Sequence, residues 1–167
     1  HTHVSFFFFF FFFFFFFCSV HCWHYRRWLA AKSGVDLTDE LAFITKKINL
    51  NFSNYSAWHY RTHLLPALGL TSLDTYSKEL DLVQSAMYTE PYDQTVWMYH
   101  RWVLKAVVAV KNDPEAASDG RRDRAVALLD QEIERCEELW DCEEERCKCK
   151  FGRSLCMCVS FLGGTVP

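Results

Sequence analysis

A short sequence motif that contains Trp, Tyr and a basic residue occurs three times in this chain, and we call each copy a word. Its copies are CWHYRRWL at residues 22–29, AWHYRTHLL at 57–65 and VWMYHRWVL at 96–104, so the Trp residues lie 35 and 39 positions apart. The segments ELAFITKKINLNFSNYSAW (40–58) and ELDLVQSAMYTEPYDQTVW (79–97) also align without a gap. A period of this length is typical of helical repeat proteins, whose units each pack on the next.

Each unit is predicted to be a pair of antiparallel helices. Apolar side chains with spacings of three and four residues build one face of the first helix, namely Leu41, Ile44 and Ile48 in one unit and Leu80, Val83 and Met87 in the next. The words themselves form the second helices, which are apolar on two adjacent stripes. Asn51 to Asn54 and Pro91 interrupt the helices within units, and Asn112, Asp113 and Pro114 give a further start signal.

A last, long helix is expected from about Arg121. Its predicted inner side carries Ala125, Leu128, Ile133, Cys136 and Leu139. Because no helix pair can bury both of its own apolar faces, the pairs must stack. We therefore predict an all-α fold, a right-handed solenoid of antiparallel helix pairs over residues 20–148, similar in style to tetratricopeptide arrays.

The twelve consecutive Phe residues at 6–17 are assigned to a separate low-complexity segment, residues 1–19. With its neighbours the run is close to the shortest bilayer-spanning helix, and its length also suits a signal-peptide core, although no basic segment precedes it. A third interpretation is simpler. Phe codons contain only pyrimidines, and a pyrimidine-rich tract precedes a splice acceptor, so a misread intron would produce the same run. We take no functional information from it.

Cysteines are confined to the two ends of the chain, and residues 23–135 contain none. This distribution fits a reducing compartment and excludes a disulfide scaffold for the middle. A zinc site could be formed by four cysteines near the C-terminus, Cys147, Cys149, Cys156 and Cys158. However, a one-residue gap between paired cysteines makes a poor tetrahedral chelate. We therefore expect no metal site, and residues 149–167 are interpreted as an irregular, Cys-rich tail.

The formal net charge of -3 gives no basic field for nucleic acid or for an anionic membrane. The sequence predicts a cytoplasmic protein without nucleic-acid partners and without stable membrane insertion.

The three words and their spacing resemble the repeats of protein prenyltransferase alpha subunits. HCWHYRRW, NFSNYSAWHYR and DQTVWMYHRW are most similar to the alpha subunit of the Rab-directed, type II geranylgeranyltransferases. The resemblance covers roughly residues 20–110 and, more weakly, the helix to Lys148. The alpha subunit shared by farnesyltransferase and the type I enzyme stays open as an alternative, and so does a helical-repeat interaction module without an enzymatic partner.

The resemblance implies a heterodimer in which the alpha subunit wraps a beta subunit. The beta subunit carries the zinc and most of the pocket for geranylgeranyl diphosphate, and the acceptor is a C-terminal cysteine of a Rab protein presented by an escort protein. No cofactor is then expected in this chain. The family's alpha lysine, five residues before a Trp in a K-x-Y-x-x-W word, corresponds here to Ser53. The lysine-bearing repeat is expected upstream, so no catalytic residue is assigned and this chain alone is predicted to be inactive.

Three sets of residues recur at equivalent positions of the words. The Trp residues are predicted packing anchors, and the Tyr residues either bond to the neighbouring unit or face a partner. The basic residues Arg26, Arg61 and His100 should be partly enclosed and paired, either with helix carbonyls of this chain, which we favour, or with acidic groups of a beta subunit. The anchors are Trp23, Trp58 and Trp97; the candidates for partner or substrate contact are Tyr25, Arg26, Tyr55, Tyr60, Arg61, Tyr99, His100 and Arg101.

His59 and His63 lie four residues apart, so a helix would place both on one face, where they could chelate a metal. No third ligand is evident from the sequence, and solvated surface histidines are the simpler interpretation.

Overall fold

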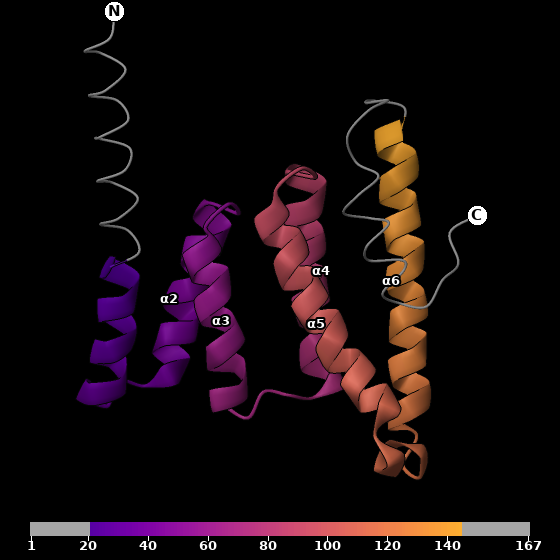
Figure 1. Ribbon diagram of the computed structural model, residues 1–167, viewed down its shortest axis with the longest axis horizontal. Helices are drawn as coiled ribbons and strands as arrows, with labels where there is room; N and C mark the ends of the chain where they lie inside the picture. Colours follow the sequence, from indigo (N-terminus) through magenta and orange to yellow (C-terminus); the bar gives the residue numbers. More distant parts are fainter. Residues whose placement is uncertain (1–20, 145–167) are drawn as a thin grey trace, which may run out of the picture.

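A row of antiparallel helices makes up the part of the chain that the structure, a computed structural model, describes, residues 21–144. Residues 21–33 are helical. They are followed by α2 (Leu37–Leu50), α3 (Tyr55–Ala67), α4 (Leu73–Thr89), α5 (Gln94–Asn112), the short 3-10 helix η1 (Pro114–Ala117) and α6 (Arg121–Glu144). The helices follow one another across the molecule in chain order (Figure 1). The predicted all-α array of helix pairs is confirmed.

Local signals in the sequence set the starts of the helices. Side-chain oxygens of Asp36, Asn54, Ser72 and Asp93 accept hydrogen bonds from backbone amides in the first turns of α2 to α5. Each of these caps satisfies a donor that has no partner inside the helix. The signal at Asp113 and Pro114 starts η1 and not the long helix, which begins seven residues after Pro114, at Arg121.

Gly69 ends α3. Its φ of 69° lies in the left-handed region, and the amides of Gly69 and Leu70 donate to the carbonyls of Pro66 and Leu65. This is the Schellman arrangement, in which a glycine without a Cβ lets the chain leave the helix at a sharp angle. The turn directs the chain into α4.

The core is continuous along the array. The predicted inner positions of the first helices are buried, with Ile44, Ile48, Leu80 and Val83 fully enclosed. On α6 the expected inner side is also buried at Ala125, Leu128, Cys136 and Leu139, whereas Ile133 is only half-buried. One cluster of buried side chains runs from Ile44 to Leu139, so the units share a single core and do not fold around separate ones.

Several predicted features lie outside the described residues. They are the Phe-rich segment 1–19, residues 145–148 at the end of the predicted repeat domain, the four cysteines Cys147, Cys149, Cys156 and Cys158, and the tail 149–167. None of the helices in residues 21–144 combines the length and the apolar character that a bilayer span needs.

Candidate functional site

The basic residues of the words lie at the junctions between successive units. Arg26 donates two hydrogen bonds to Glu40 of α2, Nε to Oε2 at 3.0 Å and Nη2 to Oε1 at 2.7 Å. One unit further on, Arg61 of α3 makes the same two-point contact with Glu79 of α4, at 2.6 Å for both bonds. In each case the second helix of one unit is tied to the first helix of the next.

A tyrosine from the following second helix completes each contact. The hydroxyl of Tyr99 donates to Oε2 of Glu79 at 2.7 Å, and the corresponding Tyr60 lies close enough to Glu40 for this carboxylate to raise the pKa of Tyr60. We call these two sets, Arg26–Glu40–Tyr60 and Arg61–Glu79–Tyr99, triads. Each triad joins three helices.

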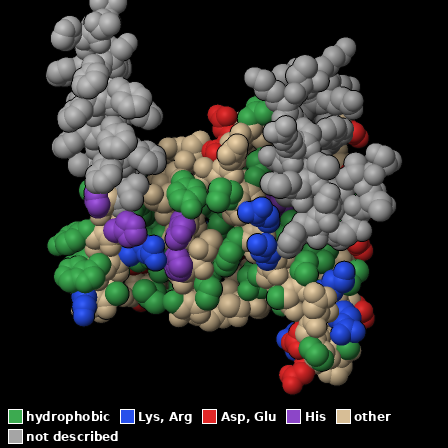
Figure 2. Space-filling view, in the orientation of Figure 1, with side chains coloured by type: hydrophobic (Ala, Val, Ile, Leu, Met, Phe, Trp, Pro, Cys, Tyr) green, Lys and Arg blue, Asp and Glu red, His purple; other side chains and the backbone are tan. Residues whose placement is uncertain are grey.

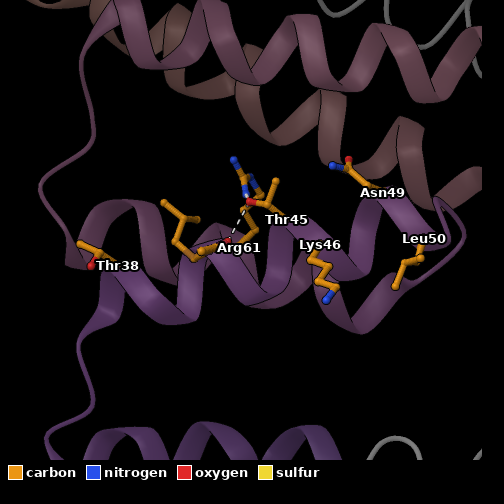
Figure 3. Close-up of a pocket in the computed structure, with 8 residues that line it drawn as sticks. Thr38, Thr45, Lys46, Asn49, Leu50 and Arg61 are labelled. Atoms are coloured by element: carbon orange, nitrogen blue, oxygen red, sulfur yellow. Dashed lines mark hydrogen bonds between the residues drawn. The ribbon is translucent and has the colours of Figure 1, made fainter.

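The second triad also reaches α2. Nη1 of Arg61 donates to Oγ1 of Thr45 at 2.8 Å, and that hydroxyl donates in turn to the carbonyl of Leu41. Figure 3 shows Arg61 and Thr45 side by side on the floor of an open groove of about 660 Å³ that runs along α2. Because Arg61 is itself 7% exposed, only its edge reaches this groove, and its charge is directed at Glu79.

The electrostatics of the triads follow from burial and charge pairing. Burial opposes the charge on Arg61, but hydrogen bonding and attraction by Glu79 outweigh it, and the pKa of Arg61 is raised. Burial also raises the pKa of Tyr99, and the nearby negative charge of Glu79 raises it further. Burial and Glu40 act on the pKa of Tyr60 in the same direction. Both tyrosines therefore keep their phenolic protons.

At the third junction, between α5 and α6, a histidine takes the place of the arginine that contacts the glutamate. Nε2 of His100 lies 3.0 Å from Oε2 of Glu132, and both side chains are almost fully buried. The other oxygen of Glu132 accepts from Arg135 at 2.6 Å, and Arg135 also pairs with Asp81 of α4. Arg135 thus adds a cation at the carboxylate that corresponds to Glu40 and Glu79.

These contacts correct one expectation from the sequence. Arg26, Arg61 and His100 are paired within the chain as predicted, but their partners are glutamate carboxylates of the next first helix and not the helix carbonyls that we favoured. A carboxylate offers a guanidinium two acceptors in one plane, which a single carbonyl cannot.

Glu40, Glu79 and Glu132 were not recognised as partners from the sequence. The signal was present: each is followed by an aliphatic residue at the next position and by Ile44, Val83 or Cys136 four positions later. In α6 the same spacing places Glu132 at the position that Glu40 and Glu79 occupy in the first helices of their units.

The eight candidate contact residues separate into two groups. Tyr60, Arg61, Tyr99 and His100 are buried at the junctions. Tyr25 and Tyr55 are 63% and 49% exposed, and Arg26 and Arg101 are half-buried. Of the three Trp residues, Trp58 and Trp97 lie in the core and donate through Nε1 to the carbonyls of Phe52 and Pro91, each at 2.7 Å, whereas Trp23 packs at the edge of the core.

The exposed candidates lie on the second helices of their units. Tyr25 stacks on Trp28 with ring centroids 5.8 Å apart, and Tyr55 lies 5.8 Å from His59. Met98 of α5 is also exposed. The visible surface carries apolar side chains interspersed with His and basic side chains (Figure 2). We use the name outer aromatic face for the exposed aromatic and Met side chains of the second helices, which are Tyr25, Trp28, Tyr55 and Met98.

The rings of His59 and His63 lie 4.9 Å apart on α3. Among residues 21–144, no group of three or more His, Cys, Asp or Glu side chains is arranged to hold a metal ion.

Residues 37–68 and 76–107 match the protein prenyltransferase alpha subunit repeat family, and these matches cover the pairs α2–α3 and α4–α5. The two helix pairs are protein prenyltransferase alpha subunit repeats. The resemblance inferred from the three words is thereby confirmed. The matched units contain Glu40, Arg61, Glu79 and His100, whereas Arg26 and Glu132 lie outside the matched ranges.

The chain is similar to proteins named geranylgeranyl transferase type-2 subunit alpha. Over 93 residues, half of this chain, it is 50% identical to those of Bos taurus and Homo sapiens. Over 144 residues, 77% of this chain, it is 32% identical to that of Schizosaccharomyces pombe. The matched part spans 16% of the length of the two mammalian relatives and 42% of the yeast one.

Proposed function

We propose that this chain supplies part of the alpha subunit of a type II protein geranylgeranyltransferase, the class that modifies Rab proteins. The observation that carries the proposal is the pair of prenyltransferase repeats together with 50% identity to mammalian type-2 alpha subunits. The relatives reported above all bear the type-2 name, which favours this class over the alpha subunit shared by farnesyltransferase and the type I enzyme.

In this proposal the chain is a scaffold. The buried triads fix the spacing of the second helices, and the outer aromatic face offers a surface for the beta subunit. Exposed aromatic and Met side chains suit such a contact, because these residue types are enriched in protein interfaces.

The chemistry of transfer belongs to the beta subunit. The zinc ion expected there would supply the thiolate chemistry for transfer of the geranylgeranyl group from its diphosphate, and no residue of this chain is assigned to that step. The escort protein presents the Rab substrate, and the reaction takes place in the cytoplasm. Ser53 stands where the resemblance would put the alpha lysine of a K-x-Y-x-x-W word, so we expect no transfer activity from this chain alone.

Coexpression with beta subunits tests the proposal. The full 167-residue chain should copurify with a type-2 beta subunit and not with a farnesyltransferase beta subunit. Trp28→Ala and Tyr55→Ala remove exposed rings of the outer aromatic face and should weaken the complex at least tenfold. Tyr88→Ala removes a comparably exposed ring from α4 and serves as the control. Failure to bind either beta subunit, with the chain folded, would contradict the proposal.

A second function is favoured by the Ser at position 53. Without the lysine near the diphosphate, the chain could act as a helical-repeat interaction module that binds a partner but supports no transfer. A stable complex with the type-2 beta subunit that transfers geranylgeranyl to an escorted Rab protein would exclude this function.

A further inference from the structure

An open groove of about 420 Å³ lies between helical residues 21–33 and α3. Its polar and aromatic lining consists of His24, Arg27 and Trp28 from the first of these helices and Tyr60 and His63 from α3. The other lining side chains are Ala and Leu. In Figure 2 histidine and basic side chains gather on the visible surface over this part of the array.

No acidic residue is among the side chains that line the groove. The nearest relevant carboxylate, Glu40, is occupied by the two-point contact with Arg26. Arg27 makes no ion pair with a carboxylate in residues 21–144; its guanidinium lies 5.6 Å from the ring centroid of Tyr60. Its charge is thus directed into the groove without a neutralising partner in the described part of the chain.

The surroundings of His63 are electropositive. Its pKa is lowered by desolvation, then by the charge of Arg27 and by His59. Bound negative charge would reverse this effect and favour protonation of His63. The charged or titratable side chains that face His63 are Arg27 and His24 from the neighbouring helix and His59 and Tyr60 from α3, while α2 contributes only Leu37 to the groove.

We infer that this groove binds a small organic phosphate or diphosphate. Arg27 presents a planar fork of donors that matches two phosphate oxygens, and the ring nitrogens of His24 and His63 supply donors from two different helices. Trp28, 55% exposed at the rim, provides a ring against which the organic part can pack. This inference does not depend on the proposed prenyltransferase function, because its argument rests on His24, Arg27 and His63, none of which belongs to a triad, although Tyr60 of the first triad and Trp28 of the outer aromatic face also line the groove.

Calorimetric titration of the full chain with inorganic pyrophosphate at pH 7 is the first test. EDTA in the buffer removes metal ions that could bridge His59 and His63. Arg27→Gln should weaken binding at least tenfold. Arg101→Gln is the matched control, because Arg101 occupies the same position of its word on α5 and also has no carboxylate partner among the described residues. Equal losses in the two variants would overturn the inference and indicate binding by net charge alone.

A pH series with sulfate separates the role of the histidines from the titration of the probe, since sulfate keeps its charge between pH 5.5 and 8.5. Binding should strengthen at least fivefold from pH 8 to pH 6, because a bound anion favours the protonated form of His63. His63→Gln should reduce this dependence, and Arg27→Lys should retain part of the affinity if the variant is folded. Binding that is independent of pH, or absent for both probes, would overturn the inference.

Discussion

Arg61 and Glu79 are both almost fully buried, with side chains 8% and 5% exposed. Removal of one member leaves the other charge without a partner in a poorly solvated place. Glu79→Gln should therefore lower the free energy of unfolding by about 3 to 5 kcal/mol. Urea denaturation monitored by circular dichroism measures the change.

The exposed pair Arg124–Asp74 is the matched control, because it joins α6 to α4 at the surface. Arg124→Met should cost less than about 1 kcal/mol. The double variant Arg61→Met/Glu79→Leu should recover much of the loss, since apolar side chains can replace a buried ion pair. A loss for Glu79→Gln as small as that for Arg124→Met would show that the triad contributes little.

Ionisation of Tyr99 should lower the stability of the fold at alkaline pH. Burial and Glu79 raise its pKa in the folded state above the ordinary value near 10. Above that pH the unfolded chain loses the phenolic proton and the folded chain keeps it, so stability is full below about pH 10 and falls as pH rises. The slope from one such group is at most about 1.4 kcal/mol per pH unit.

In Tyr99→Phe this contribution is absent. The free energy of unfolding, measured by urea titrations between pH 8 and 11, should start lower because a hydrogen bond to Glu79 is lost, and then decline less steeply than in the parent chain. Curves that are parallel above pH 10 would contradict the assignment.

The sequence allowed the enclosure of the basic residues to be predicted but not the identity of their partners. Arg61 follows a core Trp by three positions, and this spacing on a helix implies partial burial. Its partner Glu79 lies 18 residues further along, and their contact depends on how α4 sits against α3. Local periodicity carries no such information.

The indole groups of Trp58 and Trp97 each connect the second helix of a pair to the turn that precedes it. Trp58 and Trp97 each donate to a carbonyl six residues earlier, in the turn between the two helices of their unit. The bond fixes the turn to the second helix, and its two copies have the same length. It explains why the word keeps an indole at this position in both complete units.

Trp97→Phe removes this donor and part of the ring. We expect a loss of about 2 to 4 kcal/mol, from the unpaired carbonyl of Pro91 and from the smaller side chain in a packed core. Thermal unfolding followed at 222 nm would measure it. Trp102→Phe, on the same helix and only half-buried, makes a similar change in volume and should cost less; equal losses would show that the hydrogen bond to the turn is unimportant.

Most elements were predictable because helix caps, periodic apolar residues and turn residues agree with one another. The connection before α6 was not. Asp113 caps only the four-residue η1, and the chain then turns at Gly120 before the long helix begins. This extra segment lengthens the distance from glutamate to glutamate from 39 residues to 53, which concealed Glu132 as the third member of the series.

Across the whole array, the junction contacts couple neighbours. In a repeat protein the stability is a sum of intrinsic terms for each unit and interface terms between units. Here buried charged side chains lie at the interfaces between units. If a neighbouring unit unfolded, the remaining unit would expose its core and would also keep a buried charged side chain without its partner. The described units should therefore unfold together.

Hydrogen exchange detects this coupling. In the parent chain the slowest amides of α3 and α4 should exchange with the same free energy of opening. In Glu79→Gln the interface term is reduced, and the amides of α3 should separate from those of α4 in their exchange. Independent exchange of the two helices in the parent chain would contradict strong coupling.

The direction of the junction contacts has a consequence for how such arrays change length during evolution. Each unit contributes one basic side chain to the next unit and one glutamate to the preceding unit, so the glutamate of any unit can pair with the arginine or histidine of any other. A duplication or deletion of one whole unit leaves every carboxylate paired. A recombination inside a unit leaves one buried charge alone, and selection would remove it. The pairing therefore defines the segment that can be copied.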